Sequence, residues 1–218
     1  MKTIVFSNGN FAPADWCKNL LKNADQIIVA DGGARYALMM GLKVDHLIGD
    51  MDSIELEDFN TLKEQGCKIS VFPEDKDKTD LELAVDLAVK LGSDEIHILA
   101  SDGGRFDHQL GNALIGANIR YMEVPIWFYS GNQRATTVYP VEEKVFATVS
   151  GSLLSVIPLC EKVANFTIRG VDWPLNNVEL RLGSTFTISN KSAGNEVKVS
   201  FTSGVVLFIL EDVADVLK

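Results

Sequence analysis

The chain has 218 residues and a formal net charge of −10, and hydrophobic residues make up 46% of it. This length suits one large domain or two small ones, and this apolar content supplies a core and argues against wholesale disorder. The negative charge argues against a protein that binds nucleic acid or an anionic membrane non-specifically.

The cysteines and the N-terminus predict a cytoplasmic protein. Cys17, Cys67 and Cys160 are odd in number and widely spaced, so they form neither a disulfide framework nor a CxxC metal motif. The apolar stretch in residues 1–6 is too short for a signal peptide. No apolar run approaches the roughly 20 residues that cross a bilayer, so we expect no membrane partner.

The first 130 residues alternate between two kinds of segment. Short apolar, β-branched runs are typical of buried strands, and the stretches between them have helical character. The predicted strands are residues 3–7, 26–30, a short strand ending at 47–48, 68–72, 95–100 and 125–129. The predicted helices are residues 13–22, 34–40, 55–65, 79–91 and 107–121. This alternation predicts an α/β domain with a mostly parallel sheet.

Helical periodicity disappears after about residue 131. Short apolar runs then recur at a spacing of roughly eight to twelve residues, which is typical of a β-sandwich or barrel. These runs are residues 135–139, 144–149, 153–158, 164–169, 185–189, 196–201 and 205–210. We therefore predict an α/β domain over residues 1–132 and an all-β domain over residues 133–218.

Two carboxylates follow the third predicted strand. Asp50 and Asp52 stand two residues apart, so in an extended backbone they project to the same side. Adjacent anions repel one another unless a cation or protons intervene, and Mg²⁺ prefers oxygen ligands. The pair is therefore a candidate metal site; the alternative is a solvated acidic turn.

Three more predicted strands end in polar loops. They are Asp31-Gly32-Gly33, the mixed-charge segment from Lys76 to Asp80, and the segment that carries Arg105 and Asp107. Ligands of open α/β sheets bind outside the carboxyl ends of the strands, so four such loops at one edge predict a binding site. Each loop also has a structural alternative. The glycine pair suits a tight turn, Thr79 and Glu82 have the spacing of a capping box, and Asp107 suits a helix N-cap.

The all-β half offers two candidate ligand contacts. Trp173 could stack on an aromatic ring, and Ser189 and Asn190 could hydrogen-bond a heterocycle. The alternatives are a core tryptophan and an ordinary turn.

Taken together, these motifs resemble the thiamine pyrophosphokinase family over nearly the whole chain. The first-half motifs are Ala30-Asp31-Gly32-Gly33, Gly49-Asp50-Met51-Asp52-Ser53, Asp77-Lys78-Thr79-Asp80 and Gly104-Arg105-Phe106-Asp107-His108. The second-half motifs are Asp172-Trp173-Pro174-Leu175 and Ile188-Ser189-Asn190. Two residues depart from the family pattern: Met51 replaces the more usual Phe or Leu, and Lys78 replaces the common Gln or Glu.

The resemblance implies that the pyrophosphoryl group of ATP is transferred to the hydroxyl of thiamine, which gives thiamine diphosphate and AMP. It implies Mg²⁺ and a homodimer with the active site at the interface. By position, the metal ligands are Asp50, Asp52 and Asp80, and the catalytic residues are Asp80, Arg105 and Asp107. The nucleotide contacts are Asp31, Gly32, Gly33, Asp77, Lys78, Thr79 and Arg105, and the thiamine contacts are Trp173, Ser189 and Asn190.

Two other functions remain open at this point. Paired aspartates at strand ends also serve metal-dependent nucleotide phosphohydrolases, and a non-catalytic module could sense thiamine or a nucleotide. A transferase must in addition activate an alcohol, for which a carboxylate is a candidate base, and Asp107 or Asp80 is nominated.

Overall fold

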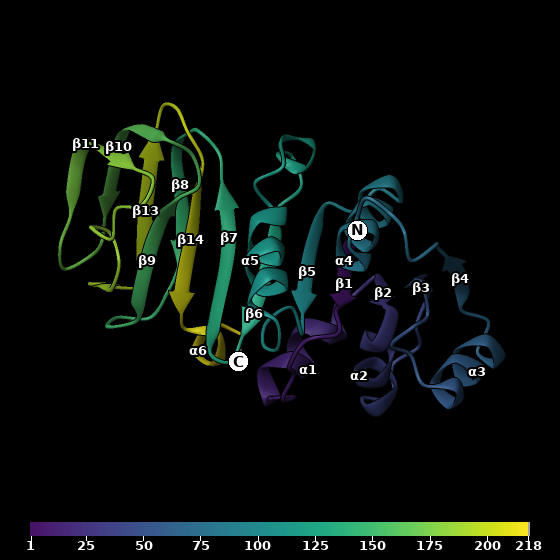
Figure 1. Ribbon diagram of the computed structural model, residues 1–218. Coiled ribbons are helices and arrows are strands. Elements are labelled where there is room, and N and C mark those ends of the chain that lie inside the picture. Colours follow the sequence, from purple (N-terminus) through teal and green to yellow (C-terminus); the bar gives the residue numbers. More distant parts are fainter. Residues whose placement is uncertain (218) are drawn as a thin grey trace. The chain divides into compact units, whose positions relative to one another are not determined.

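The computed structural model describes residues 1–217, which form two compact units (Figure 1). The first unit comprises residues 1–115 and 123–130, and the second comprises residues 116–122 and the chain from residue 131 onward. The predicted fold class is confirmed, because an α/β unit precedes a unit built of antiparallel sheets.

The sheet of the first unit is parallel throughout, in the order β4-β3-β2-β1-β5-β6. Its strands are β1 (Lys2–Phe6), β2 (Gln26–Ala30), β3 (His46–Gly49), β4 (Lys68–Val71), β5 (Glu95–Leu99) and β6 (Ile126–Ser130). The chain moves outward from β1 to β4 and then returns to the other side of β1. The strand order therefore reverses beside β1, and such a reversal is where open α/β sheets bind ligands.

Helices follow the strands as predicted, with one difference. They are α1 (Asp15–Lys22), α2 (Ala34–Met39), α3 (Leu56–Glu64), α4 (Asp80–Lys90) and α5 (Phe106–Ile115), with a 3₁₀ turn η1 (Asp31–Gly33). The helix predicted over residues 107–121 is too long. It ends at Ile115, and a separate 3₁₀ turn, η2 (Ile119–Tyr121), begins where the side chain of Asn118 accepts a hydrogen bond from the Arg120 N–H. Within residues 1–217, no helix is both long and apolar enough to span a membrane.

Helix α4 follows the mixed-charge loop that begins at Lys76 and anchors it to the sheet of the first unit. Its buried residues Leu81, Ala84, Val85 and Ala88 recur at helical spacing and face the sheet. Thr79 is the N-cap, and its hydroxyl oxygen accepts a hydrogen bond from the Glu82 N–H at 3.2 Å. The predicted structural use of Thr79 is confirmed, and the cap fixes where the helix begins.

We expect Thr79→Ala to lower the free energy of unfolding by about 1 kcal/mol, because the first turn of α4 loses a partner for one backbone N–H. Urea denaturation followed by circular dichroism measures this change. Thr79→Ser keeps the hydroxyl and should retain most of the stability; equal losses in both variants would contradict the capping role.

The second unit contains two antiparallel sheets, in the orders β12-β9-β14-β7 and β11-β10-β13-β8. Its strands are β7 (Gln133–Val138), β8 (Val141–Ala147), β9 (Leu153–Pro158), β10 (Lys162–Arg169), β11 (Leu175–Arg181), β12 (Asn190–Lys191), β13 (Glu196–Phe201) and β14 (Val206–Glu211), and a short helix, α6 (Val213–Val216), follows. Phe146 of β8 stacks on Phe208 of β14, with ring centroids 4.1 Å apart, so side chains of the two sheets share one core.

The strand predicted at residues 185–189 is wrong, and β11 and β12 lie outside the predicted runs. Isolated hydrogen bonds connect the segment to β9: the Val156 N–H donates to the Thr187 carbonyl at 3.0 Å, the Thr187 hydroxyl donates to the Val156 carbonyl, and the Ser189 N–H donates to the Ser155 hydroxyl at 3.1 Å. Its apolar side chains, Phe186 and Ile188, are exposed. The alternating apolar residues Phe186 and Ile188 thus line a surface hollow, whereas the predicted strand would have packed them into a core.

Candidate functional site

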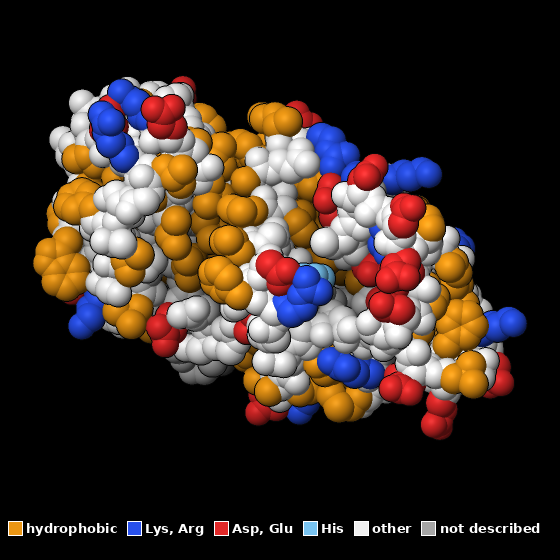
Figure 2. Space-filling model, viewed as in Figure 1, with side chains coloured by type: hydrophobic (Ala, Val, Ile, Leu, Met, Phe, Trp, Pro, Cys, Tyr) orange, Lys and Arg blue, Asp and Glu red, His pale blue; other side chains and the backbone are white. Residues whose placement is uncertain are grey.

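Residues from all four predicted loops line one hollow at the carboxyl ends of β1, β2, β3, β4 and β5, with a volume of about 610 Å³. We call it the strand-end cavity. It lies entirely in the first unit, where Figure 2 shows acidic side chains gathered on the surface. Of the sequence-predicted residues, the cavity is lined by Asp31, Asp50, Asp52, Asp77, Lys78, Thr79, Asp80 and Arg105. Because parallel strands end at one edge, segments far apart in the sequence meet here.

Three carboxylates form an acidic cluster in this cavity: Asp31, Asp50 and Asp52 each offer an oxygen within 4.8 Å of the others. Asp31 is 3% exposed, and its Oδ1 has no hydrogen-bond partner among the described residues, while its Oδ2 accepts from the Ser53 N–H at 3.1 Å. Burial, together with the neighbouring Asp52, raises the pKa of Asp31 to about 6. A buried, unpartnered carboxylate oxygen beside two further carboxylates fits a hard divalent cation.

Lys76 connects the acidic cluster to Asp80. Its ammonium nitrogen lies 2.6 Å from Asp50 Oδ2 and 3.1 Å from Asp80 Oδ1. The contact with Lys76 lowers the pKa of Asp50, whereas burial raises the pKa of Asp80. The sequence places Lys76 in a mixed-charge loop, but spacing alone gives no sign that it would bridge two carboxylates.

The backbone is strained at the ends of three strands around this cavity. Asp31, Met51 and Ala100 have positive φ values of 48°, 67° and 58°. These values are uncommon for residues other than glycine, and such residues concentrate at functional sites. Gly49 is also constrained, since a Cβ there would lie 3.0 Å from Asp31 Cβ and 3.3 Å from Asp80 Oδ1. The turn after β3 therefore depends on a glycine to bring the carboxylates together.

The glycine pair after Asp31 has a packing role. A Cβ on Gly32 would lie 2.6 Å from the Asn8 side chain, and one on Gly33 would lie 2.4 Å from the Phe6 carbonyl oxygen. Both glycines are buried, and they bring the loop after β2 against the loop after β1. Ser7, Asn8 and Gly9 line the cavity as well. In the sequence, Asn8 and Gly9 are typical of a turn, and this turn signal hides their position at the strand reversal.

Arg105 and Asp107 bind each other in this structure. The Arg105 guanidinium donates from Nε to Asp107 Oδ1 at 3.2 Å and from Nη2 to Oδ2 at 2.6 Å. Both side chains are exposed, and the paired guanidinium lowers the pKa of Asp107 to about 2. Helix α5 begins at Phe106, so Asp107 lies inside the first turn, and the alternative of a helix N-cap is wrong. Arg105 and His108 line the cavity.

Lys78 forms ion pairs with two carboxylates of α4. Its ammonium group contacts Asp86 and lies 3.6 Å from Glu82 Oε1. Asp77 and Thr79 flank it at the cavity wall. The loop from Lys76 to Asp80 thus directs Lys76 to Asp50 and Asp80, and Lys78 to Glu82 and Asp86 farther along α4.

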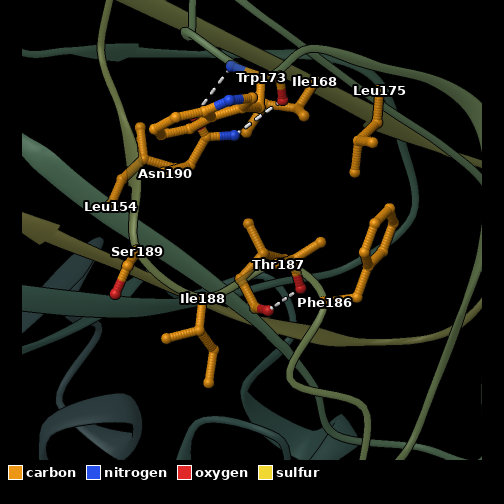
Figure 3. Close-up of a pocket in the computed structure, with 10 residues that line it drawn as sticks. Leu154, Ile168, Trp173, Leu175, Phe186, Thr187, Ile188, Ser189 and Asn190 are labelled. Atoms are coloured by element: carbon orange, nitrogen blue, oxygen red, sulfur yellow. Dashed lines mark hydrogen bonds between the residues drawn. The ribbon is translucent and has the colours of Figure 1, made fainter.

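A second hollow, the β-unit pocket, lies in the second unit and has a volume of about 290 Å³ (Figure 3). Trp173, Phe186 and Ile188 form much of its wall, together with Ser189 and Asn190. Trp173 is 59% exposed, so the alternative of a core tryptophan is wrong. Ser189 has a positive φ of 63°.

The Asn190 side chain holds the backbone of Trp173. Its Oδ1 accepts from the Trp173 N–H at 3.2 Å, and its Nδ2 donates to the Trp173 carbonyl oxygen at 2.8 Å (Figure 3). Oδ1 also accepts from the Lys191 N–H at 2.8 Å. Asn190 therefore fixes the loop that presents the indole, which is a second use beside the predicted ligand contact.

Two family models match the chain. The model described as "Thiamin pyrophosphokinase, catalytic domain" matches residues 17–128, and "Thiamin pyrophosphokinase, vitamin B1 binding domain" matches residues 140–206. Thiamine pyrophosphokinase of Bacillus subtilis is 30% identical over 182 residues, which cover 84% of this chain and 85% of that protein. Thiamine pyrophosphokinase 2 of Arabidopsis thaliana is 28% identical over 204 residues, which cover 83% of this chain and 74% of that protein.

Solved structures agree with the sequence comparisons. The crystal structure of the B. subtilis thiamine pyrophosphokinase has a TM-score of 0.85 at 26% identity and covers 97% of this chain and 99% of that chain. The thiamin pyrophosphokinase of Geobacillus thermodenitrificans has a TM-score of 0.82 at 28% identity and covers 97% of this chain and 98% of that chain. The chain, with a match to each of the two family models, belongs to the thiamin pyrophosphokinase family.

Proposed function

We propose that this chain transfers the pyrophosphoryl group of ATP to the hydroxyl of thiamine, with Mg²⁺, to give thiamine diphosphate and AMP. The observation that carries the proposal is that each unit of this family member contains a hollow: an acidic cavity at the strand ends of the first unit and an aromatic pocket in the second unit. Attack on the β-phosphorus requires that phosphate charge is neutralised and that the hydroxyl is held in line.

The acidic cluster is the proposed metal site. Asp50 and Asp52 hold Mg²⁺ together with Asp31, whose buried Oδ1 has no partner among residues 1–217, and Asp80 is a fourth candidate ligand. When bound, the ion neutralises charge on the polyphosphate, which carboxylates cannot do directly. Asp31 thus takes a metal role in this proposal, beside the nucleotide contact predicted from the sequence.

Cavity-wall residues beside the cluster are proposed to hold the nucleotide. Asp77, Lys78 and Thr79 flank it on one side, and Arg105 offers a planar fork for a phosphate on the other. Gly32 and Gly33 support this wall by close packing. If Arg105 binds phosphate, it releases Asp107, which is then free to accept the proton of the attacking hydroxyl; Asp80 is the other candidate base.

The β-unit pocket is the proposed thiamine site. Trp173 presents an exposed aromatic face, which suits a cationic, aromatic ligand. Ser189 lies in the pocket wall for hydrogen bonding, and Asn190 holds the tryptophan loop. The negative net charge of the chain favours the approach of a cation.

We also propose a homodimer with its active site at the interface, and a cytoplasmic location. The homodimer rests on the resemblance of the motifs, and light scattering of the purified protein tests it. The free thiols of Cys17, Cys67 and Cys160 suit a reducing compartment.

The decisive experiment incubates the purified protein with ATP, Mg²⁺ and thiamine and identifies the products by mass. We expect thiamine diphosphate and AMP in equal amounts, and no AMP without thiamine. AMP formed without an acceptor would instead indicate a nucleotide phosphohydrolase, a function that no observation here favours. Substrate binding without turnover would indicate a sensing module.

A further inference from the structure

Lys76 is a cation of the strand-end cavity that contacts the proposed metal ligands directly. It lies in the loop between β4 and α4, and its side chain is only 11% exposed. Its ammonium group contacts Asp50 and Asp80, which follow different strands. One positive charge is therefore held among four carboxylates, namely those of Asp31, Asp50, Asp52 and Asp80.

This arrangement makes the lysine and a metal ion competitors. Asp50 belongs both to the acidic cluster and to the Lys76 contact. A divalent cation held by Asp50 would repel the nearby ammonium group and would share the charge of the same carboxylate. The gain from binding a free metal ion is therefore reduced by the loss of the Lys76 contacts.

A polyphosphate changes this balance. Three donors of an ammonium group can turn to phosphate oxygens, and lysine is a common phosphate ligand. Lys76 and Lys78 line the same cavity, but Lys78 is already held by Asp86 and Glu82 on α4. Lys76 is thus the lysine whose carboxylate partners a metal ion would take over.

We propose that Lys76 is a built-in counter-ion, which holds Asp50 and Asp80 in place before the metal arrives and moves to the polyphosphate when the metal–nucleotide complex binds. It is a positioning residue, and its effect is to make metal and nucleotide bind together. The claim that Lys76 holds Asp50 and Asp80 before a metal binds depends only on the contacts of Lys76. The claim that Lys76 then moves to the polyphosphate rests on the proposed function.

The test is to measure the binding of Mn²⁺ alone, by isothermal titration and electron paramagnetic resonance, to the full-length protein and to Lys76→Met. We expect Mn²⁺ to bind the variant about tenfold more tightly, because a competing charge is gone. Lys78→Met is the matched control, since it removes the same charge from the same loop but from other partners, and its Mn²⁺ affinity should change less than about twofold. Equal or weaker Mn²⁺ binding by Lys76→Met would overturn the inference.

The second measurement adds a non-hydrolysable ATP analogue. With Mn²⁺ present, the analogue should bind Lys76→Met about tenfold more weakly than the unchanged protein, since a phosphate contact is lost. Unchanged analogue binding would overturn the transfer to polyphosphate. Circular dichroism checks folding, and Lys76→Gln replaces the methionine variant if that variant does not fold. Neither measurement involves thiamine, so failure to form thiamine diphosphate would defeat the proposed function and leave these results standing.

Discussion

Asp52→Asn should reduce turnover by on the order of 10²- to 10³-fold while the protein stays folded. The substitution keeps the size of the side chain but removes one negative charge from the acidic cluster, where Asp52 lies with Asp31 and Asp50. Asp52 is exposed, and its carboxylate accepts a hydrogen bond from the hydroxyl of its neighbour Ser53 at 2.7 Å. The loss should therefore fall on metal binding and on charge neutralisation, with little effect on the core.

Steady-state rates over a range of Mg²⁺ concentrations measure this effect. The matched control is Glu57→Gln, which removes one negative charge from the exposed first turn of α3, outside the strand-end cavity. We expect the control to keep its rate, because an exposed charge away from the site has little influence at physiological ionic strength. A near-normal rate of Asp52→Asn at saturating Mg²⁺ would remove Asp52 from the proposed metal site.

The parallel sheet could be predicted because its central strands, such as β1 and β2, are buried on both faces and therefore carry continuous apolar runs. The runs at Ile4-Val5-Phe6 and Ile27-Ile28-Val29 are of this kind, and the predicted β2 matches the observed bounds. The rule that parallel strands expose their carboxyl ends at one edge then brings the loops after them together. Asp50, Asp52 and Asp80 were placed in one cavity by that rule, without any knowledge of their contacts.

Side-chain partners could not be predicted in the same way. Nothing in the order Asp31-Gly32-Gly33 says whether the carboxylate faces a nucleotide or other carboxylates, and the structure directs it to Asp50 and Asp52. Lys76 and Lys78 belong to the same mixed-charge loop, yet Lys76 contacts Asp50 and Asp80 inside the cavity. Lys78 contacts Glu82 and Asp86 farther along α4. Likewise, Phe186 and Ile188 alternate as strand residues do but line a pocket. Such differences depend on tertiary packing, which overrides local pattern.

Trp173→Ala should raise the KM for thiamine about 30-fold, with a smaller change in kcat, since loss of a stacking partner costs about 1–3 kcal/mol. The indole is 59% exposed at the wall of the β-unit pocket, so its removal costs little core packing. The backbone of residue 173 should stay in place, because the Asn190 side chain hydrogen-bonds its N–H and carbonyl groups. These bonds do not involve the indole, so they survive its removal. The KM for ATP should stay unchanged, because the strand-end cavity is lined only by residues of the first unit.

Two variants separate stacking from a general effect of lost apolar surface. Trp173→Phe keeps an aromatic face and should recover most of the affinity for thiamine. Leu182→Ala removes an apolar side chain that is 63% exposed in the same unit but outside the pocket, and it should leave the KM unchanged. An unchanged KM in Trp173→Ala, or an equal rise in Leu182→Ala, would mean that the exposed indole serves another purpose. In that case the thiamine site would have to be sought away from the tryptophan loop, although the acidic cluster would keep its proposed role.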